Sequence, residues 1–262
     1  MPETEWGWEI TPAELESWVV ERVGALLVLN KPAGVVCHPS KHGAWSSLAG
    51  AAREYLGATK LHMPFRLDRE TSGVMLLTGD EATGRRLQRA VNAGRYRKRY
   101  VALLSGALTA RTQVDLPIGA HAASQVRLKR STLEDGTGQA ATTVFVPLAG
   151  DAEYTLVGVL PATGRLHQIR VHAQAIGHPI LGDKIYGPDE SLFVEFIEHG
   201  WTPRHEQILG WRRQALHCIR VEFENVEIGG KRMFQAPLAP DIKNFCEKRL
   251  GFSAADYLPD FE

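Results

Sequence analysis

The order of apolar and polar residues along this chain of 262 residues predicts more strands than helices. Short runs of apolar, β-branched and aromatic residues bounded by turn-forming residues are typical of strands. Such runs occupy residues 26–29, 35–37, 73–78, 96–104, 125–131, 141–147, 153–160 and 216–227. Several neighbouring strands can pair as hairpins, the first two through the β-turn sequence Lys31-Pro32-Ala33-Gly34. We therefore predict an α+β fold with a mixed, mostly antiparallel sheet and flanking helices, rather than a doubly wound parallel sheet.

Helical spacing of apolar residues predicts four helices. They cover about 11–23, 80–93, the segment between Thr163 and Gly177, and 241–249. Thr11 and Glu14 form a capping box at the start of the first helix, and Gly94 stands where the second needs a left-handed cap. The third carries the apolar stripe Leu166, Ile169, Ala173 and Ile176, and Thr163 is placed to cap it. The least regular stretch, 187–214, is interpreted as an insertion on the surface.

Composition indicates a globular protein of the cytoplasm. Hydrophobic residues make up 44% and charged residues 23%, which is enough for a packed core. Cys37, Cys218 and Cys246 are an odd number at wide spacings, which favours reduced thiols over a disulfide framework. The acidic start Met1-Pro2-Glu3-Thr4-Glu5 does not resemble a signal peptide, and the apolar run 25–29 is too short to cross a bilayer. We expect no membrane association.

One carboxylate, Asp68, stands between Arg66 and Arg69 in the segment 65–73. Nearby cations lower the pKa of a carboxyl group and hold it ionised. A fixed carboxylate in a cationic pocket suits a nucleophile or base that acts on an anionic polymer. The alternative is an ordinary surface ion pair, since Asp and Arg are common neighbours.

A block of positive charge follows. No acidic residue occurs from Ala82 to Val114, although the formal net charge of the chain is +0. The block contains Arg85, Arg86, Arg89, Arg95, Arg97, Lys98, Arg99 and Arg111. Together with Tyr96 and Tyr100, this pattern is typical of a surface that binds a phosphate backbone. An acidic protein partner or a solubilising face are the alternatives.

A second group of candidates lies in the segment 161–172. Arg165 is near the expected helix start, whereas Arg170 lies deeper and needs a carboxylate or phosphate partner, because an unpaired buried charge is costly. Asp68 is the natural candidate. His167 and His172 are five residues apart and do not share one helical face, which disfavours a metal site and makes His167 a packing residue.

Six segments in this order resemble the RluA family of pseudouridine synthases. They are NKPAG at 30–34, RLDRETSG at 66–73, KRYVALLSG at 98–106, TGRLHQIRVHAQAIGHPILGDKIYG at 163–187, RQALH at 213–217 and FQAPL at 234–238. The resemblance runs from about Leu26 to Arg249. It implies a catalytic domain over 25–262 and an N-terminal extension with a helix over 1–24, too short for an RNA-binding module of the S4 type. The chain would thus be a compact member of the family.

The resemblance also implies a reaction. Such enzymes detach uracil from its ribose within RNA, rotate it and rejoin it through a carbon–carbon bond, without metal or cofactor. Asp68 matches the catalytic aspartate, as nucleophile or base, and Tyr100 matches the tyrosine that stacks on the target base. Arg170 matches the basic residue paired with the aspartate, and Arg66 the arginine that holds the base out of the helix.

The implied partner is RNA, either tRNA or rRNA. We expect a monomer, because no extra apolar surface helix stands out in the sequence. The residues expected to contact RNA are Arg66, Arg69, Arg165, Arg85, Arg86, Arg89, Arg95, Arg97 and Lys98. Two positions depart from the family pattern: Phe65 stands where histidine is usual, and 223–226 reads Phe-Glu-Asn-Val instead of Phe-x-His-Pro. A non-catalytic RNA-binding or RNA-chaperone protein of the same fold is the main rival. A metal-dependent nucleic-acid hydrolase is weaker, because clustered carboxylates are missing.

Overall fold

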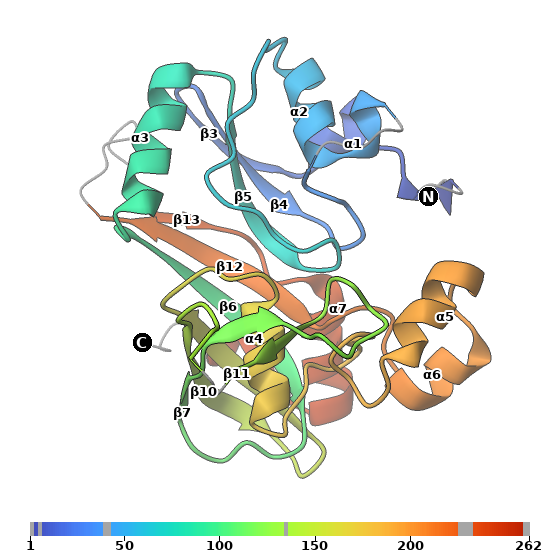
Figure 1. Cartoon of the computed structure of the whole chain (residues 1–262). Helices are drawn as coiled ribbons and strands as arrows, with labels where there is room; N and C mark the ends of the chain where they lie inside the picture. The colour runs from blue at the N-terminus through green and yellow to red at the C-terminus, as the bar shows by residue number, and fades with distance from the viewer. Residues whose placement is uncertain (1–2, 5–6, 39–42, 134–135, 225–232, 259–262) are drawn as a thin grey trace. The chain divides into compact units, whose positions relative to one another are not determined.

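The computed structural model describes residues 3–4, 7–38, 43–133, 136–224 and 233–258. The chain forms two compact units, Met1–Lys98 with His217–Ala239 and Arg99–Leu216 with Pro240–Glu262 (Figure 1). The helices of the described residues are α1 (Pro12–Ser17), α2 (Leu48–Tyr55), α3 (Glu81–Asn92), α4 (Gln168–Ala175), α5 (Ser191–His199), α6 (Pro203–Leu209) and α7 (Pro240–Phe245). Cys246–Leu250 continues α7 as a π-helical turn.

Within the described residues, nine strands belong to a mixed, mostly antiparallel sheet, which confirms the predicted fold class. They are β3 (Val19–Val23), β4 (Leu26–Lys31), β5 (Ser72–Thr78), β6 (Tyr96–Ser105), β7 (Thr112–Asp115), β10 (Thr142–Gly150), β11 (Tyr154–Pro161), β12 (Leu216–Phe223) and β13 (Met233–Gln235). Two smaller hairpins pair β1 (Glu3–Thr4) with β2 (Gly7–Trp8), and β8 (Ile118–Ala120) with β9 (Arg130–Thr132).

In the first unit, β4 lies between β3 and β5 and is antiparallel to both. All seven residues of β5 are buried, as the apolar residues at its centre predict. β12 runs parallel to β5, with His217 opposite Ser72 and Cys218 opposite Gly73. Gly73 has φ of 115°, and a Cβ atom there would lie 2.1 Å from the carbonyl oxygen of Cys218, so this approach of the two strands requires glycine.

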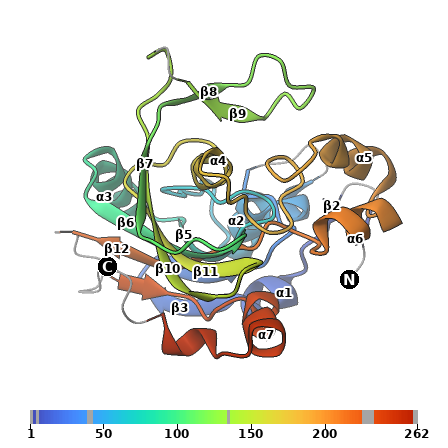
Figure 2. The same cartoon turned by 90° about the horizontal axis from the view of Figure 1, so that it is seen from below.

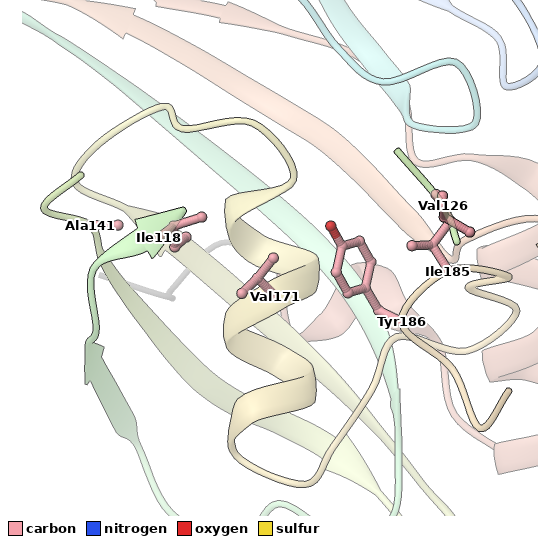
Figure 3. Packing of buried hydrophobic residues seen from close by; sticks show 6 residues of the cluster. All are labelled: Ile118, Val126, Ala141, Val171, Ile185 and Tyr186. Atoms are coloured by element: carbon pink, nitrogen blue, oxygen red, sulfur yellow. The ribbon is translucent and has the colours of Figure 1, made fainter. Parts of the chain in front are cut away.

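In the second unit, β11 lies between β6 and β10, and β7 pairs with the outer edge of β10. Figure 2 shows α4 on one side of β10 and β11 and α7 on the other, with the β8–β9 hairpin beyond α4. A small buried cluster packs around α4 and the hairpin (Figure 3); its members are Ile118, Val126, Ala141, Val171, Ile185 and Tyr186. This core fixes α4 and the segment that follows it.

The structure corrects two predictions near the N-terminus. The capping box of Thr11 and Glu14 is confirmed, but α1 ends at Ser17, and residues 19–23 form β3. The β-branched residues of this segment suit a strand that pairs with β4. Residues 35–37 are not a returning strand. The carbonyls of Val36 and Cys37 instead accept hydrogen bonds from the amides of Leu48 and Ala49, at the start of α2.

Three further predictions were wrong in part. The third helix begins at Gln168, and Leu166 of its expected stripe is 45% exposed. Within 125–131 only the last two residues belong to a strand, β9. The stretch 187–214 is not irregular, since it contains α5 and α6. The departure at 225–226 lies outside the described residues.

Candidate active site

A tight turn holds Asp68 in front of β5. The Asp68 carbonyl accepts a hydrogen bond from the amide of Thr71 at 3.1 Å, and β5 begins at the next residue. The turn is also fastened to the loop after β4. The amide of Gly34 donates to the Arg69 carbonyl at 2.8 Å, and Arg69 Nε donates to the Gly34 carbonyl at 3.0 Å. Arg69, expected to contact RNA, therefore holds the turn in place through one nitrogen of its exposed side chain.

Lys31 connects the same two segments from inside the protein. Its side chain is fully buried, and Nζ donates to the carbonyls of Pro32 at 2.8 Å, Val35 at 2.9 Å and Arg69 at 3.0 Å. A buried ammonium is tolerated only where such acceptors surround it. The lysine of the NKPAG segment thus braces the Asp68 turn. Sequence reasoning missed this role, because a lysine after a strand is normally solvated.

We expect Lys31→Met to lower the free energy of unfolding by about 3 kcal/mol, because buried carbonyl groups lose a charged donor. Denaturant titration of the variant and the wild type measures this difference. Lys60→Met is the matched control, since Lys60 belongs to the same unit and is exposed. A loss at Lys31 no larger than at Lys60 would contradict the bracing role.

Phe65, which replaces the usual histidine, supports the turn by aromatic packing. It is 8% exposed and stacks on Tyr96 with 6.3 Å between ring centroids, and Tyr96 stacks on Phe223 at 6.0 Å. Lys98 Nζ lies 5.3 Å from the Phe65 ring centroid and 5.8 Å from that of Tyr96. Burial lowers the pKa of Lys98, while nearby Cys218 and Asp68 raise it. Lys98 therefore packs among aromatic rings near Asp68 and is not part of an open basic face.

The exposed basic face is formed by the outer side of α3 and the turn that follows. Arg85, Arg86, Arg89 and Arg95 are all exposed, whereas Leu87 and Ala90 on the inner side of α3 are buried. Arg85 forms an exposed ion pair with Glu81 at 2.9 Å. We call this surface the α3 face.

Two other candidate arginines of the first unit differ from the α3 face. Arg97 is exposed and donates through two nitrogens to Glu224, at 3.0 and 2.8 Å. The Glu224 carboxylate therefore neutralises the charge of Arg97, which was expected to contact RNA. Arg66 is exposed and lies two residues before Asp68.

In the second unit, Tyr100 lies in β6 opposite Val159 of β11 and is 5% exposed. Arg170 on α4 is 5% exposed and forms a bidentate ion pair with Asp183, with Nε at 2.6 Å and a terminal nitrogen at 2.8 Å. Arg170 thus has a carboxylate partner, as predicted, and that partner is Asp183, whereas Asp68 was expected. A pairing of Arg170 with Asp68 stays a prediction.

Sequence reasoning missed Asp183, the buried partner of the candidate residue Arg170. It is fully buried and also accepts hydrogen bonds from the amides of Ile185 and Tyr186, each at 3.0 Å. Burial alone raises the pKa of this carboxyl, but the Arg170 charge and these hydrogen bonds outweigh it and lower the pKa overall. The Arg170 guanidinium also lies 4.9 Å from the Tyr186 ring centroid. A lone acid within the mostly apolar segment 179–186, which also contains one lysine, was the available signal.

The two histidines of this segment serve packing. His167 precedes α4 with φ of 58°, the one positive φ of a non-glycine residue in the part described, and its Nδ1 lies 2.9 Å from the Tyr186 hydroxyl. His172 is buried, with its ring nitrogens 2.9 Å from Thr143 Oγ1 and 2.9 Å from the Leu116 carbonyl. These contacts confirm the packing interpretation of His167. No group of three metal-binding side chains occurs among the described residues.

Gln168 organises the loop before α4. Its Oε1 accepts from Thr163 Oγ1 at 2.7 Å and from the Arg165 amide at 3.0 Å, and its Nε2 donates to the Thr142 carbonyl at 2.9 Å. Thr163 therefore does not cap the helix directly, and the prediction that it caps the helix is wrong. Arg165 is exposed, and its Nε donates to the Ala140 carbonyl at 3.2 Å.

The model of the family "RNA pseudouridylate synthase" matches residues 25–175, more than half of the chain. The chain belongs to this family. It is therefore an RNA pseudouridine synthase, an isomerase, and the resemblance to the RluA family is confirmed. The chain is 30% identical to "Ribosomal large subunit pseudouridine synthase D" of Vibrio vulnificus, over 98% of this chain and 78% of the relative.

Other relatives agree with this assignment. The "Uncharacterized RNA pseudouridine synthase YjbO" of Bacillus subtilis is 32% identical over 83% of this chain and 71% of its own length. The solved structure titled "Human RNA Pseudouridylate Synthase Domain Containing 4" is 24% identical and has a TM-score of 0.70, over 90% of this chain and 94% of that one. This likeness confirms the fold. The described helices of this pseudouridine synthase include none that is long and apolar enough to cross a membrane.

Proposed function

We propose that this pseudouridine synthase isomerises specific uridines in structured tRNA or rRNA, with Asp68 as the catalytic carboxylate. The observation that carries the proposal is the bracing of the Asp68 turn by Lys31, Gly34 and Arg69. When the protein holds a reacting group in a fixed geometry, less conformational entropy is lost on the way to the transition state. Exposed Arg66 next to it supplies a cation toward the anionic substrate.

The proposed roles of the other residues follow from what the reaction demands. Chemistry on a base requires the nucleotide to leave the stack, which costs a few kcal/mol and is offset by stacking and phosphate contacts. We propose that Tyr100 stacks on the flipped uracil and that Arg66 holds it out of the helix. Arg170 would pair with Asp68 while the sugar–base bond is broken. The detached uracil must stay in a dry pocket until it is rejoined.

The RNA class is part of the proposal. Relatives that include the Vibrio enzyme are named for the ribosomal large subunit, which favours rRNA as the first substrate to test. Proteins of this kind recognise RNA through single-stranded loops and shape, which the fold alone does not specify. We propose residues 25–262 as the catalytic domain, acting as a monomer in the cytoplasm without metal or cofactor.

Tritium release from RNA labelled at uracil C5 tests the proposal, because that carbon exchanges its hydrogen for the new bond to ribose. Separate tRNA and rRNA pools, transcribed without modification, are incubated with the wild type in the presence of chelator. Release from either pool with chelator is expected. Tight RNA binding without release from either pool would favour the non-catalytic RNA-binding rival, and release that chelator abolishes would contradict the metal-free mechanism.

The α3 face is expected to bind the RNA backbone. We predict that Arg86→Gln with Arg89→Gln weakens RNA binding and reduces the slope of log K against log salt concentration by about 1.5, since each lost phosphate contact contributes about 0.7–0.9. Arg22→Gln with Arg53→Gln is the control, as both arginines are exposed in the same unit and each pairs with a glutamate. Equal slopes for the two double variants would show that only net charge matters.

A further inference from the structure

A buried hydrogen bond between two side chains joins the start of β5 to β12 in the first unit. Ser72 Oγ lies 2.9 Å from His217 Nδ1, and the two residues are 4% and 0% exposed. They also face each other in the parallel register of the two strands, next to the pair of Gly73 and Cys218. The parallel pairing of β5 with β12 consists of the pairs His217–Ser72 and Cys218–Gly73. Because this pairing is short, the side-chain hydrogen bond is a substantial part of the connection between the two strands.

The strand end held in this way carries the Asp68 turn. Thr71, whose amide closes the turn on the Asp68 carbonyl at 3.1 Å, directly precedes Ser72. Lys31 and Gly34 fasten the turn on the side of the β4 loop through the Arg69 carbonyl. The Ser72–His217 hydrogen bond fastens it on the other side. A shift of Ser72 must therefore be taken up by the few residues between it and the Asp68 carboxylate.

We propose that Ser72 and His217 are positioning residues for uridine isomerisation. Their hydrogen bond fixes the first residue of β5 and, through the backbone, the direction of the Asp68 carboxylate. This inference rests on the proposed catalytic role of Asp68. Neither side chain has to touch the uridine. A reacting group displaced by about 1 Å can cost about 100-fold in rate, so the loss of one hydrogen bond here affects catalysis more than folding.

Ser72→Ala is the first test, with kcat and KM for tritium release and the midpoint of denaturation as readouts. We expect kcat to fall by about 10- to 100-fold with KM nearly unchanged. The matched control is Thr78→Val, at the opposite end of the same seven-residue strand. Thr78 is also fully buried, and its hydroxyl donates to the Ala25 carbonyl at 2.7 Å and accepts from the Asp80 amide at 3.1 Å. This control should shift the midpoint at least as much and leave kcat unchanged.

His217 offers a second test that separates positioning from packing. In His217→Asn the amide group takes the place of Nδ1, whereas in His217→Gln it takes the place of Nε2. We expect the asparagine variant to keep kcat within a few-fold of the wild type, because a partner for Ser72 remains. In the glutamine variant, kcat should fall by as much as it does in Ser72→Ala. When Ser72→Ala is present as well, His217→Asn should have no higher kcat than His217→Gln, because the hydroxyl partner is gone.

The outcomes separate this inference from the proposed function. The positioning role is overturned if Ser72→Ala and Thr78→Val have equal kcat, or if the two His217 variants have equal kcat. The proposed function still stands in that case, provided that the wild type is active and Asp68→Asn is inactive. An active Asp68→Asn overturns both. If Ser72→Ala does not fold, the comparison of the two His217 variants decides alone.

Discussion

Asp68→Asn is expected to abolish tritium release from RNA, with a loss of at least about a thousandfold relative to the wild type. The amide has the shape of the carboxylate but is neither a base nor a nucleophile at neutral pH. The backbone hydrogen bond that closes the turn uses the Asp68 carbonyl, which the substitution keeps. Folding and RNA affinity should therefore stay close to those of the wild type, as measured by circular dichroism and filter binding.

Glu70→Gln is the control for this prediction. Glu70 belongs to the same turn, and its substitution removes the same charge by the same chemistry. It should retain activity, because the proposed reaction uses the carboxylate of Asp68 and not that of Glu70. Wild-type rates for Asp68→Asn would exclude Asp68 as the catalytic group. Equal losses in both variants would mean that the charge of the turn matters more than the position of a particular carboxylate.

The second large effect concerns stability. We expect Asp183→Asn to lower the free energy of unfolding by about 3–5 kcal/mol, because it leaves the Arg170 charge buried without its carboxylate. Arg170 is 5% exposed and Asp183 fully buried, so water cannot replace the lost partner. Denaturant titration measures the loss. Since the folded-state pKa of Asp183 is lowered, its contribution is complete above about pH 4 and declines as the pH falls further.

A surface pair provides the comparison. Glu81→Gln removes the partner of Arg85, and both side chains of that pair are more than half exposed, at 61% and 59%. Such pairs contribute at most about 1 kcal/mol. Arg170→Met with Asp183→Leu should recover much of the stability lost in Asp183→Asn, since no charge remains buried. A loss in Asp183→Asn as small as that in Glu81→Gln would show that solvent reaches the Arg170 guanidinium.

The sequence predicts well those elements whose pattern is local. The seven residues of β5 are apolar or small and all are buried, and α3 begins after its Asp80 cap and ends before Gly94 as expected. The first helix shows the limit. Its capping box identifies where α1 begins, but the following valines fit a helix or a strand, and pairing with β4 decides between them. The deciding residues of β4 begin only three positions after β3 ends, but they lie outside the segment whose spacing predicts a helix.

The candidate site shows the same limit. Asp68, Tyr100 and Arg170 could be named as candidates from motifs, because each stands in a short, specific segment. Their neighbours could not. Asp183 reaches Arg170 across the loop between α4 and the segment that follows it, and its position in sequence does not show which way its side chain points. Lys31 looks like an ordinary surface lysine until three carbonyls are found around its ammonium.

The order in which the chain is synthesised has a consequence for the Asp68 turn. Each compact unit is built from two separated stretches of chain, and the first unit needs β12 from near the end. Ser72 and its partner His217 are 145 residues apart. At about 5–20 residues per second, a ribosome needs roughly 7–30 s to cover that distance. During this interval the nascent turn lacks the support of β12, and the hydrogen bond between Ser72 and His217 can form only after β12 has left the ribosome.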